Sequence, residues 1–426
     1  MNVAIVGSGG REHALALSIS KSNLLDRLFC LPGNPGTKKI ATNIQIGIND
    51  FEKILQFCKE NKIDLVVIGP EQPLVDGLSD YLRVENINVF GPSSYAAKIE
   101  SSKSFAKSLM NKSSVPTASY REFNSNEFNS AIDYLNDCKF PVVIKADGLA
   151  AGKGVIICEK LDEAINTIKE FSVDKIFGEA GQKYLIEEFM SGEEASIFAI
   201  TDGEDFIALP AAQDHKRIGE NDTGKNTGGM GAYAPTPLIS KELEDEVQHK
   251  IFRPIIKQLK KEGHPFIGCL YAGLMITKEG PKVVEFNCRF GDPETQVVLP
   301  LLEGDVLKLL FSAATGKLDM DAVRYSGGCS VCVVVASEGY PDKFEKGFEI
   351  TGLDIDDPQI IIYHAGTTEK EGKILTNGGR VLGITSVLKS NNLLEARNKA
   401  YEAIKKINFK NIYYRKDIAS KALRYL

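Results

Sequence analysis

Residues 282–295 read KVVEFNCRFGDPET. The first five predict a short strand, because three apolar side chains surround Glu285, and a glycine and a proline then end it. Glu285 and Asn287 are two positions apart, so in an extended chain both side chains leave the same face. A carboxylate beside an amide oxygen suits magnesium, and Arg289 offers a planar fork to a carboxylate or phosphate. The E-x-N-x-R pattern alone favours a solvated strand face, but the GDPET run and the upstream motifs favour a site for phosphoryl transfer to a carboxylate.

Composition and charge place the chain among multidomain globular proteins. Its 426 residues are too many for one core and suggest roughly three domains. A hydrophobic share of 43% is typical of soluble domains, and a formal net charge of −6 gives no basic field for nucleic acid. The apolar runs are too short to cross a bilayer, and the start, MNVAIV, lacks the features of a signal peptide. We therefore expect a cytoplasmic protein without nucleic-acid or membrane partners.

Eight cysteines are scattered along the chain, mostly inside apolar runs, which favours reduced thiols over a disulfide framework. Cys329 and Cys332 form a C-x-x-C pair, a pattern used for zinc and for redox chemistry. No second pair stands at zinc spacing, and this pair falls in a strand-like run. We therefore expect both thiols to be structural.

Strands and helices alternate in the first 95 residues. The predicted strands are residues 3–6, 28–31, 65–68 and 89–90, and one predicted helix is 51–62. The alternation predicts a parallel sheet with helices on both faces. Ligands of such sheets bind at the carboxyl ends of the strands, so the loops at 7–13, 32–37 and 69–71 are the informative ones.

The first of these loops, GSGGREH, matches a dinucleotide-binding fingerprint only in part. Glu12 replaces the third glycine of G-x-G-x-x-G, which disfavours a NAD-binding function. The backbone N–H groups of Gly9 and Gly10 can still approach a phosphate at a helix N-terminus, where Arg11 can pair with it. A tight strand-to-helix turn without a ligand explains the same residues equally well.

A lysine-bearing segment follows the first unit. We expect a helix at 98–111, a linker at 115–118, and two strands at 140–146 and 155–158 joined by the loop DGLAAGKG. The loop lacks the G-K-[ST] ending of a Walker loop, but a lysine beside flexible glycine backbone is a good cover for phosphates. The residues expected to cover phosphates are Lys145, Gly148, Gly152 and Lys153.

Three further segments are candidates for ligand contacts. Residues 183–189, KYLIEEF, predict a strand whose main chain could meet a purine if it lies at a sheet edge, although Glu187 and Glu188 alone are typical of a solvated face. Residues 213–217, QDHKR, and the long irregular polar loop at 226–233, NTGGMGAY, together favour a substrate loop. His215 as a general base is disfavoured, since a lone histidine is usually structural.

Residues from about 326 form a last unit. Its predicted strands are 328–337, 360–364 and 380–385, and 391–405 predict an amphipathic helix. We find no catalytic cluster in this part of the sequence and expect it to close the site or to pack against the first domain.

Taken in order, these segments resemble the glycinamide ribonucleotide synthetases, or phosphoribosylamine–glycine ligases, of the ATP-grasp superfamily. The match runs from GGREHA at 9–14 to YRKDI at 414–418, and its most specific parts are KADGLAAGKG, QDHKR, NTGGMGAY and EFNCRFGDPET. The resemblance implies an α/β and α+β multidomain fold. Its expected parts are a parallel-sheet pre-ATP-grasp domain at 1–100, an ATP-grasp core at 101–325 with a small lid at about 115–187, and a C-terminal α/β domain at 326–426.

The implied reaction joins glycine to 5-phosphoribosylamine with ATP through a glycyl phosphate, giving glycinamide ribonucleotide, ADP and phosphate in purine biosynthesis. Glu285 and Asn287 would hold Mg²⁺ or Mn²⁺, and Arg289 and Lys145 would be catalytic. The other implied contacts are Lys103, Lys145, Glu187, Phe189 and Glu194 for ATP, Arg289 for the glycine carboxylate and its acyl phosphate, and Gly9, Gly10, Arg11, Pro70 and Glu71 for phosphoribosylamine. Further candidates for substrate contacts are Asp214, Lys216, Asn226, Thr227 and Gly228.

Two other functions stay open at this point. Another ATP-grasp carboxylate ligase or carboxylase would share the core but use a different acid, and the N-terminal loops with residues 214–216 argue against it. A nucleotide-binding regulator without turnover is disfavoured by the intact Glu285, Asn287, Arg289 and Lys145. One departure from the family is Ser101, where many relatives have glycine. We expect a monomer or a weak homodimer.

Overall fold

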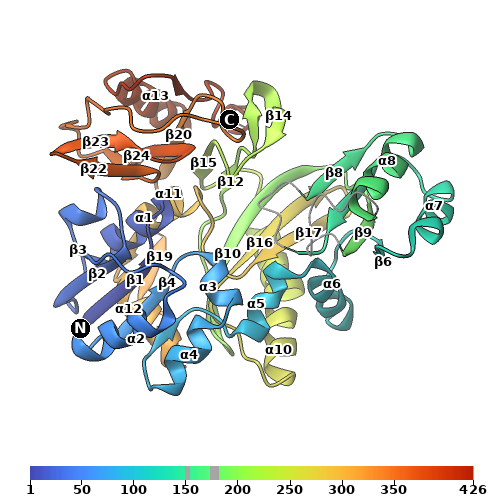
Figure 1. Cartoon of the computed structure of the whole chain (residues 1–426), viewed down its shortest axis with the longest axis horizontal. Coiled ribbons are helices and arrows are strands. Elements are labelled where there is room, and N and C mark those ends of the chain that lie inside the picture. Colours follow the sequence, from blue (N-terminus) through green and yellow to red (C-terminus); the bar gives the residue numbers. More distant parts are fainter. Residues whose placement is uncertain (149–153, 173–181, 326, 426) are drawn as a thin grey trace.

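The computed structural model describes residues 1–148, 154–172, 182–325 and 327–425 (Figure 1). These residues form a parallel sheet at the N-terminus, a small sheet in a projecting lobe, a central antiparallel sheet and a last antiparallel sheet. The architecture confirms the multidomain fold expected from the sequence, with its N-terminal parallel sheet.

The first sheet has the strand order β3-β2-β1-β4-β5, and all its pairs are parallel. Its elements are β1 (Asn2–Gly7), α1 (Gly10–Ile19), β2 (Arg27–Pro32), β3 (Thr42–Asn43), α2 (Phe51–Glu60), β4 (Leu65–Ile68), α3 (Glu71–Val75), α4 (Leu78–Val84) and β5 (Val89–Phe90). The predicted strands are confirmed, and their apolar runs are buried. Since β2 and β4 flank β1, the loops that follow these strands meet at one edge of the sheet.

The single helix predicted at 98–111 is wrong, because the chain forms two helices there. They are α5 (Ser94–Ser101) and α6 (Lys103–Lys112). Ser102, between them, has an extended backbone with φ −134° and ψ 112°, and its hydroxyl caps the first turn of α6. The N–H of Ser104 donates to the Asp147 carboxylate at 2.6 Å. The break places Lys103 at the first position of α6, where the helix end meets the loop after residue 146.

A lobe at the right of Figure 1 carries the sheet β6-β9-β7-β8. Its elements are β6 (Tyr120–Asn124), α7 (Phe128–Asn136), β7 (Val142–Ala146), β8 (Val155–Cys158), α8 (Leu161–Ser172) and β9 (Lys183–Glu188). The lobe has a hydrophobic core of its own, which includes Phe123 and Phe171. The strand predicted at 183–189 is present as β9, but it does not lie at a sheet edge, because β9 pairs with β6 on one side and with β7 on the other.

The central sheet has the order β11-β10-β16-β17 and joins the lobe to the rest of the molecule. Its strands are β10 (Glu193–Asp202), β11 (Phe206–Ala208), β16 (Ile267–Thr277) and β17 (Gly280–Asn287). The helices of this part of the chain are α9 (Lys241–Val247), α10 (Arg253–Lys261), α11 (Thr295–Val298) and α12 (Val306–Ala314), and a short ribbon pairs β18 (Leu302–Gly304) with β19 (Val323–Tyr325). The segment opened by Lys282 is thus the last strand of this sheet.

The last sheet contains two strands from the middle of the sequence. Its order is β12-β15-β20-β24-β21, and β25 also pairs with β20. The elements are β12 (Gln213–Asp214), β15 (Gly231–Ala234), β20 (Cys329–Ser337), β21 (Ile360–His364), β24 (Arg380–Leu388), α13 (Leu393–Ile404) and β25 (Ile412–Tyr413), with hairpins β13 (Arg217–Gly219) and β14 (Thr223–Asn226), and β22 (Thr367–Lys370) and β23 (Lys373–Thr376). The irregular loop expected at 226–233 is therefore wrong in its second half, where β15 is a buried strand.

The first and last units meet at His13 on α1 and His364 at the end of β21. The N–H of His364 donates to Nδ1 of His13 at 2.9 Å, and the His13 ring packs edge-on against Tyr363 at 5.6 Å between ring centres. A Cβ at Gly36 would lie 2.2 Å from Cε1 of His13, so only glycine fits there. Burial lowers the pKa of His13 to about 3 and that of His364 to about 4.

We expect acid to destabilise this contact. An unfolded histidine titrates near pH 6.5, whereas folded His13 stays neutral down to about pH 3. Between these values only the unfolded state binds the proton, so the stability of the fold decreases as the pH falls. Between pH 7 and pH 5 this group should remove about 2 kcal/mol of unfolding free energy. His13→Gln keeps a hydrogen-bond acceptor but cannot titrate. The variant should therefore lose about 2 kcal/mol less unfolding free energy between pH 7 and pH 5 than the wild type does. Urea unfolding followed by circular dichroism measures it; an unchanged pH dependence would exclude His13 as the titrating group.

The C-x-x-C thiols point to opposite faces of β20. Cys332 packs into the core shared by the first and central sheets, whereas Cys329 packs with α13 in the core of the last unit. Residues three apart on a strand leave opposite faces. The two sulfurs therefore cannot share a ligand, and their positions agree with the structural role expected from the sequence.

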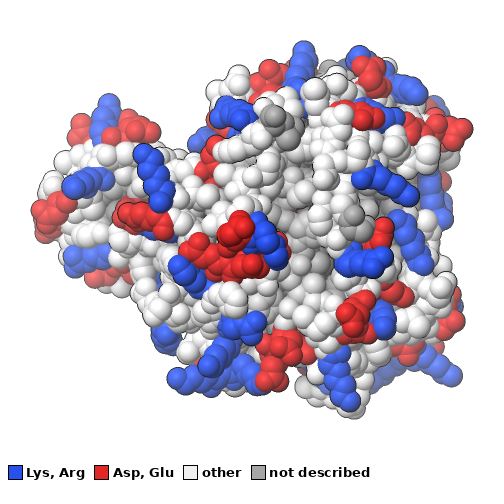
Figure 2. Space-filling model, turned by 180° about the vertical axis from the view of Figure 1, so that it is seen from behind, with Lys and Arg blue, Asp and Glu red and all other residues white. Residues whose placement is uncertain are grey.

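The surface and the helices agree with the composition. On the face shown in Figure 2, lysine and arginine side chains are interspersed with aspartate and glutamate over the described residues. No helix in the described part of the chain is long and apolar enough to cross a membrane.

Candidate functional site

Glu285 and Asn287 lie at the end of β17 and keep the two-residue spacing of one strand face. Opposite β16, Glu285 pairs with Gly273 and Val283 with Leu274, so Val284 is the extra residue of a β-bulge. The carbonyl of Val284 accepts a hydrogen bond from Nζ of Lys145 at 3.3 Å. The bulge thus brings a lysine of the lobe to the strand that carries Glu285.

Lys216 joins two carboxylates from different strands. Its Nζ lies 2.8 Å from Oε2 of Glu194 on β10 and 3.5 Å from Oε1 of Glu285. Burial acts to lower the pKa of Lys216, but Glu194 and Glu285 raise it well above its usual value. Lys216 in turn lowers the pKa of Glu285, whereas burial raises the pKa of Asp214 to about 8. Lys216 therefore offsets only part of the negative charge that Glu194 and Glu285 carry.

The oxygen atoms at this place suit a divalent cation that brings other ligands with it. Among the described residues, no three His, Cys, Asp or Glu side chains form a group that could hold a metal unaided. Glu285 and Asn287 supply two hard oxygen ligands. Mg²⁺ commonly takes only one or two carboxylates and completes its shell with water and substrate phosphates. The donor set therefore fits a metal that arrives with phosphates.

Arg289 is held by two carboxylates from the N-terminal part of the chain. Its Nη2 lies 2.7 Å from Oε1 of Glu100, and its Nε lies 3.2 Å from Oε2 of Glu71. Burial would raise the pKa of Glu71, but Arg289 and Arg11 lower it to about 2, whereas burial raises the pKa of Glu100. The N–H of Cys288 also donates to Glu100 at 2.7 Å. These contacts fix the plane of the guanidinium beside the end of β17.

Lys145 and Lys107 share one buried carboxylate. Oε2 of Glu187 lies 2.9 Å from Nζ of Lys145 and 3.2 Å from Nζ of Lys107, and all three side chains are almost fully buried. Oε1 of Glu187 has no hydrogen-bond partner among the described atoms. Burial lowers the pKa of Lys107 to about 8 against the pull of Glu187. Glu187 is thus a buried ion-pair partner, which corrects the expectation of a solvated strand face.

The remaining candidates for nucleotide contacts lie around this pair. Nζ of Lys103 donates to the carbonyl of Gly148 at 3.2 Å, and burial lowers the pKa of Lys103. Phe189 follows β9 and is 41% exposed, so its ring is available to a ligand. Gly152 and Lys153, which the sequence also predicts, lie outside the described residues.

The loop after β1 packs tightly against its surroundings. The N–H of Gly9 donates to Oε2 of Glu12 at 2.6 Å, and a Cβ at Gly10 would lie 2.7 Å from Nε2 of Gln296. Nε of Arg11 lies 2.5 Å from Oε1 of Glu12, and Nη1 lies 3.9 Å from Oε2 of Glu71. Packing alone therefore explains both glycines, while Arg11 joins the carboxylate that also holds Arg289. Glu71 begins α3, with Pro70 before it as the N-cap.

The loop between β14 and β15 lies against the last unit. The N–H of Thr227 donates to the carbonyl of Lys216 at 2.7 Å, and the N–H of Gly228 donates to the Tyr340 hydroxyl at 3.0 Å. Nη2 of Arg380 lies 3.2 Å from Oδ2 of Asp292, in the GDPET run. Asn226, the last residue of β14, pairs with Arg217. The last unit thus reaches two of the predicted motifs.

Several residues of this region were missed by the sequence reasoning. They are Lys107, Glu100, Asp292, Glu294, Tyr271 and Arg380. Burial raises the pKa of Glu294, whose Oε1 accepts from the Tyr271 hydroxyl at 3.0 Å. Lys107 stands four residues after Lys103 on the same predicted helix, and this spacing is the one local signal that could have found it.

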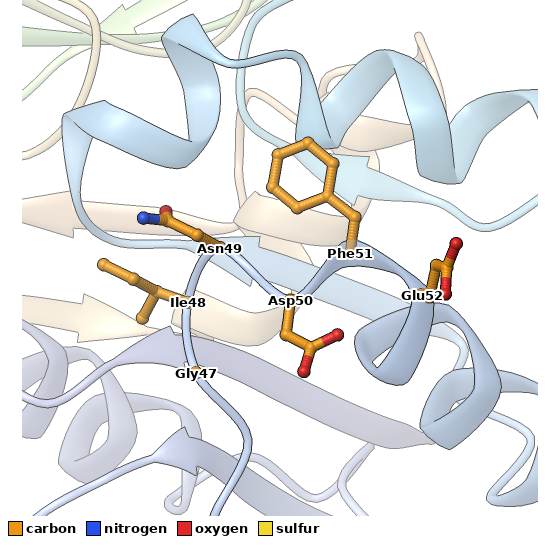
Figure 3. Close-up of a pocket in the computed structure, with 6 residues that line it drawn as sticks. All are labelled: Gly47, Ile48, Asn49, Asp50, Phe51 and Glu52. Atoms are coloured by element: carbon orange, nitrogen blue, oxygen red, sulfur yellow. The ribbon is translucent and has the colours of Figure 1, made fainter.

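A surface hollow of about 780 Å³ at residues 47–52 is not part of this site. One continuous run of chain lines it, and Figure 3 shows Asp50 and Phe51 pointing to opposite sides of the backbone. Asp50 caps α2 by accepting from the N–H of Lys53. A hollow of this kind lacks the polar groups converging from several elements that a ligand site needs.

Three family descriptions match almost the whole chain. They are "Phosphoribosylglycinamide synthetase, N domain" at residues 1–100, "Phosphoribosylglycinamide synthetase, ATP-grasp (A) domain" at 101–295 and "Phosphoribosylglycinamide synthetase, C domain" at 330–421.

Curated proteins and solved structures match over the same length. The chain is 46% identical to the phosphoribosylamine–glycine ligase of Caldanaerobacter subterraneus, over 99% of the chain and 100% of that protein, and 47% identical to that of Leptospira interrogans, over 99% of each. The crystal structure of phosphoribosylamine–glycine ligase from Thermotoga maritima superposes with a TM-score of 0.84 at 36% identity, covering 98% of this chain and 100% of that one. A biotin carboxylase domain from Hydrogenobacter thermophilus, at 15% identity and a TM-score of 0.73, over 97% of this chain and 91% of that domain, shares the fold.

Proposed function

Because the chain belongs to the phosphoribosylglycinamide synthetase family, we propose that it joins glycine to 5-phosphoribosylamine with ATP. The products are glycinamide ribonucleotide, ADP and phosphate, and the reaction is a step of purine biosynthesis. The observation that carries this proposal is the meeting of Lys145, Lys216 and Arg289 at the end of β17, beside the oxygens of Glu285 and Asn287. The two competing functions make different predictions. A regulator without turnover needs no such array of charged groups, and another ATP-grasp ligase would use an acid other than glycine.

The charge of the substrates explains why this array is needed. A carboxylate is a poor acyl donor, because its leaving group would be oxide. Transfer of a phosphoryl group from ATP turns glycine into glycyl phosphate, which the amine of phosphoribosylamine attacks, releasing phosphate. Crowded oxygens must be neutralised during the transfer, and water that would hydrolyse the acyl phosphate must be kept out.

The proposed residue roles are the ones that the family resemblance implies. The ATP phosphates meet Lys103 and Lys145 and the loop from Gly148 through Gly152 and Lys153, and adenosine meets Glu187, Phe189 and Glu194. Glu285 and Asn287 hold a divalent cation, Mg²⁺ or Mn²⁺, which offsets the charge of the phosphate oxygens. Arg289 holds the glycine carboxylate and its acyl phosphate. The substrate contacts are Gly9, Gly10, Arg11, Pro70, Glu71, Asp214, Lys216, Asn226, Thr227 and Gly228.

The proposal extends to the domains and the setting of the protein. The domains are 1–100, 101–325 and 326–426, and the lobe at about 115–187 is a lid that closes over ATP, since it has its own core and carries Lys145. All eight cysteines are free thiols, which fits the reducing cytoplasm. The protein acts as a monomer or a weak homodimer.

The test supplies Mg-ATP, glycine and freshly generated phosphoribosylamine and measures ADP release, with each omitted in turn. We expect ADP release that requires all three, with glycinamide ribonucleotide formed in equal amount. ADP release that needs bicarbonate or another acid in place of glycine would favour the other ligase, and nucleotide binding without release would favour the regulator.

Arg11→Ala should weaken the binding of phosphoribosylamine far more than the binding of ATP. The guanidinium lies at the start of α1, and its partners are Glu12, Glu71 and the carbonyl of Phe290. Loss of a charged partner should raise the KM for phosphoribosylamine about tenfold or more and leave the KM for ATP almost unchanged. Arg27→Ala is the control, since exposed Arg27 opens β2 at the opposite end of the same sheet. Equal effects on both KM values, or none on either, would make the loop after β1 purely structural.

A further inference from the structure

The motif at 414–418, YRKDI, has no place in the proposed reaction, yet it contains a large side chain buried without any exposure. Arg415 is 0% exposed, and its Nε and Nη2 donate to the two carboxylate oxygens of Asp417 at 2.8 and 2.7 Å. This pairing fixes the plane of the guanidinium. No solvent-exposed part of Arg415 is left for a ligand, so any role in turnover must act through its neighbours.

Those neighbours belong to the hairpin of β13 and β14. Nη1 of Arg415 donates to the carbonyl of Arg217 at 2.9 Å and lies 3.0 Å from Oδ1 of Asp222. The Tyr413 hydroxyl donates to the carbonyl of Ile218 at 2.7 Å. The C-terminal segment, residues 413–421, therefore donates hydrogen bonds to two consecutive main-chain carbonyls of the first strand of the hairpin.

The turn of the hairpin is held by the same segment. The N–H of Asn221 donates to Oδ2 of Asp417 at 2.8 Å, and Nζ of Lys421 lies 2.5 Å from Oδ2 of Asp222. Two cations, Arg415 and Lys421, thus face two carboxylates, and the cluster is balanced in charge. Its effect is geometric, because it leaves no net charge to act at a distance.

Residues of the proposed active site flank the hairpin at both ends. Arg217 directly follows Lys216, which lies on Glu194 and Glu285, and Thr227 follows β14. The strands have three and four residues, and Thr223 to Lys225 of β14 are exposed. A two-stranded hairpin this small is marginal alone in water. Its contacts with the C-terminal segment must therefore set where Lys216 and Thr227 lie.

We propose that Arg415 is a positioning residue that holds the hairpin at 217–226, so that Lys216 and Thr227 stay in register with β17. The inference rests on the proposed function, because it assigns Lys216 and Thr227 to substrate contacts. The nucleotide lysines Lys103 and Lys145 lie on α6 and β7, which the C-terminal segment does not touch through any contact found among the described residues. Lys216 also pairs with Glu194, which we assign to adenosine. Loss of Arg415 should therefore act most strongly on glycine and phosphoribosylamine and less strongly on ATP.

The test compares Arg415→Met and Arg415→Lys with Ile404→Ala. Ile404 is buried in α13 of the same unit, so its truncation loosens that unit while Arg415 keeps its hydrogen bonds and ion pairs. We expect Arg415→Met to lower kcat/KM for glycine and phosphoribosylamine by about tenfold to a hundredfold, with a smaller change in the KM for ATP. Arg415→Lys should recover only part, since an ammonium cannot hold Asp417 and the Arg217 carbonyl together. Ile404→Ala should show no such split between substrates.

Hydrogen exchange of the amides at 217–226 supplies a readout that does not depend on turnover. Exchange there should become faster in Arg415→Met and stay at the wild-type rate in Ile404→Ala. Unchanged exchange in the hairpin, or equal kinetic losses in Arg415→Met and Ile404→Ala, would overturn the proposal. If Arg415→Met does not fold, Tyr413→Phe replaces it. This variant removes only the hydrogen bond to the Ile218 carbonyl, so it should change the kinetics and the hydrogen exchange in the same direction but by a smaller amount. A wild-type protein without glycine-dependent ADP release would refute the proposed function, while the exchange result would still decide the role of Arg415 in holding the hairpin.

Discussion

Glu285→Gln combined with Asn287→Ala should lower glycine-dependent ADP release by about a thousandfold or more while the fold stays intact. The double change removes one carboxylate and one amide oxygen from the end of β17, the two groups that we assign to the divalent cation. Glu285 is 41% exposed, and Lys216 keeps Glu194 at 2.8 Å, so the change leaves no buried cation without a partner. The loss therefore falls on charge neutralisation during phosphoryl transfer and not on stability.

The control for this variant lies at the other end of the same strand. Glu279 pairs with Lys282 and is 76% exposed, so Glu279→Gln changes the charge by the same amount without touching the site. Circular dichroism checks the fold, and a Mn²⁺ titration with ADP present checks metal binding. A near-normal rate of the double variant at ordinary magnesium concentrations would show that the metal assignment is wrong.

The local features of the fold could be predicted from the sequence because they depend on short-range patterns. The strands of the first sheet are apolar runs that end at turn residues, and β7 and β8 are close enough in sequence to form a hairpin. The spacing of Glu285 and Asn287 was informative for the same reason, since two positions on one strand share a face even next to the bulge at Val284.

Features that depend on partners distant in the sequence could not be predicted. Ser102 looks like an ordinary helix residue in the sequence, but the carboxylate of Asp147, 45 positions later, accepts from its hydroxyl and from the N–H of Ser104. Glu187 reads as a solvated residue because neither Lys107 nor Lys145 is visible as its partner in the local pattern. The membership of β15 in the last sheet depends on β20, about a hundred residues away. In each case the deciding contact is a long-range one.

The site follows the same division. Arg289 could be proposed from the sequence because it continues the pattern of β17, but Glu100 and Glu71, which orient it, come from helices of the first part of the chain. The last unit carries no catalytic motif of its own, yet Arg380 reaches Asp292 and Arg415 reaches the hairpin after Lys216. Motifs suggest which groups could meet a substrate, whereas the residues that position those groups are identified only by their contacts in the fold.

Arg289→Lys should lower turnover by about a hundredfold to a thousandfold although the positive charge is kept. In the folded chain the guanidinium meets Glu100 through Nη2, Glu71 through Nε and the carbonyl of Phe290 through Nη1, three directions at once. An ammonium is a point charge without a planar fork, so it cannot keep these contacts and also present paired donors to the glycine carboxylate.

The kinetic pattern of this variant separates its role in holding glycine from its role in holding the protein together. Arg324→Lys is the matched control, because Arg324 pairs with Glu303 on the surface and its side chain is 80% exposed. If Arg289 holds the carboxylate, Arg289→Lys should raise the KM for glycine and lower kcat, because the same donors serve the acyl phosphate, while nucleotide affinity changes little. If Arg289 is purely structural, Arg289→Lys should instead weaken the binding of all three substrates together and lower the midpoint of unfolding. A wild-type rate and glycine KM in Arg289→Lys would contradict the carboxylate assignment, since the paired contact is the one feature that lysine cannot reproduce.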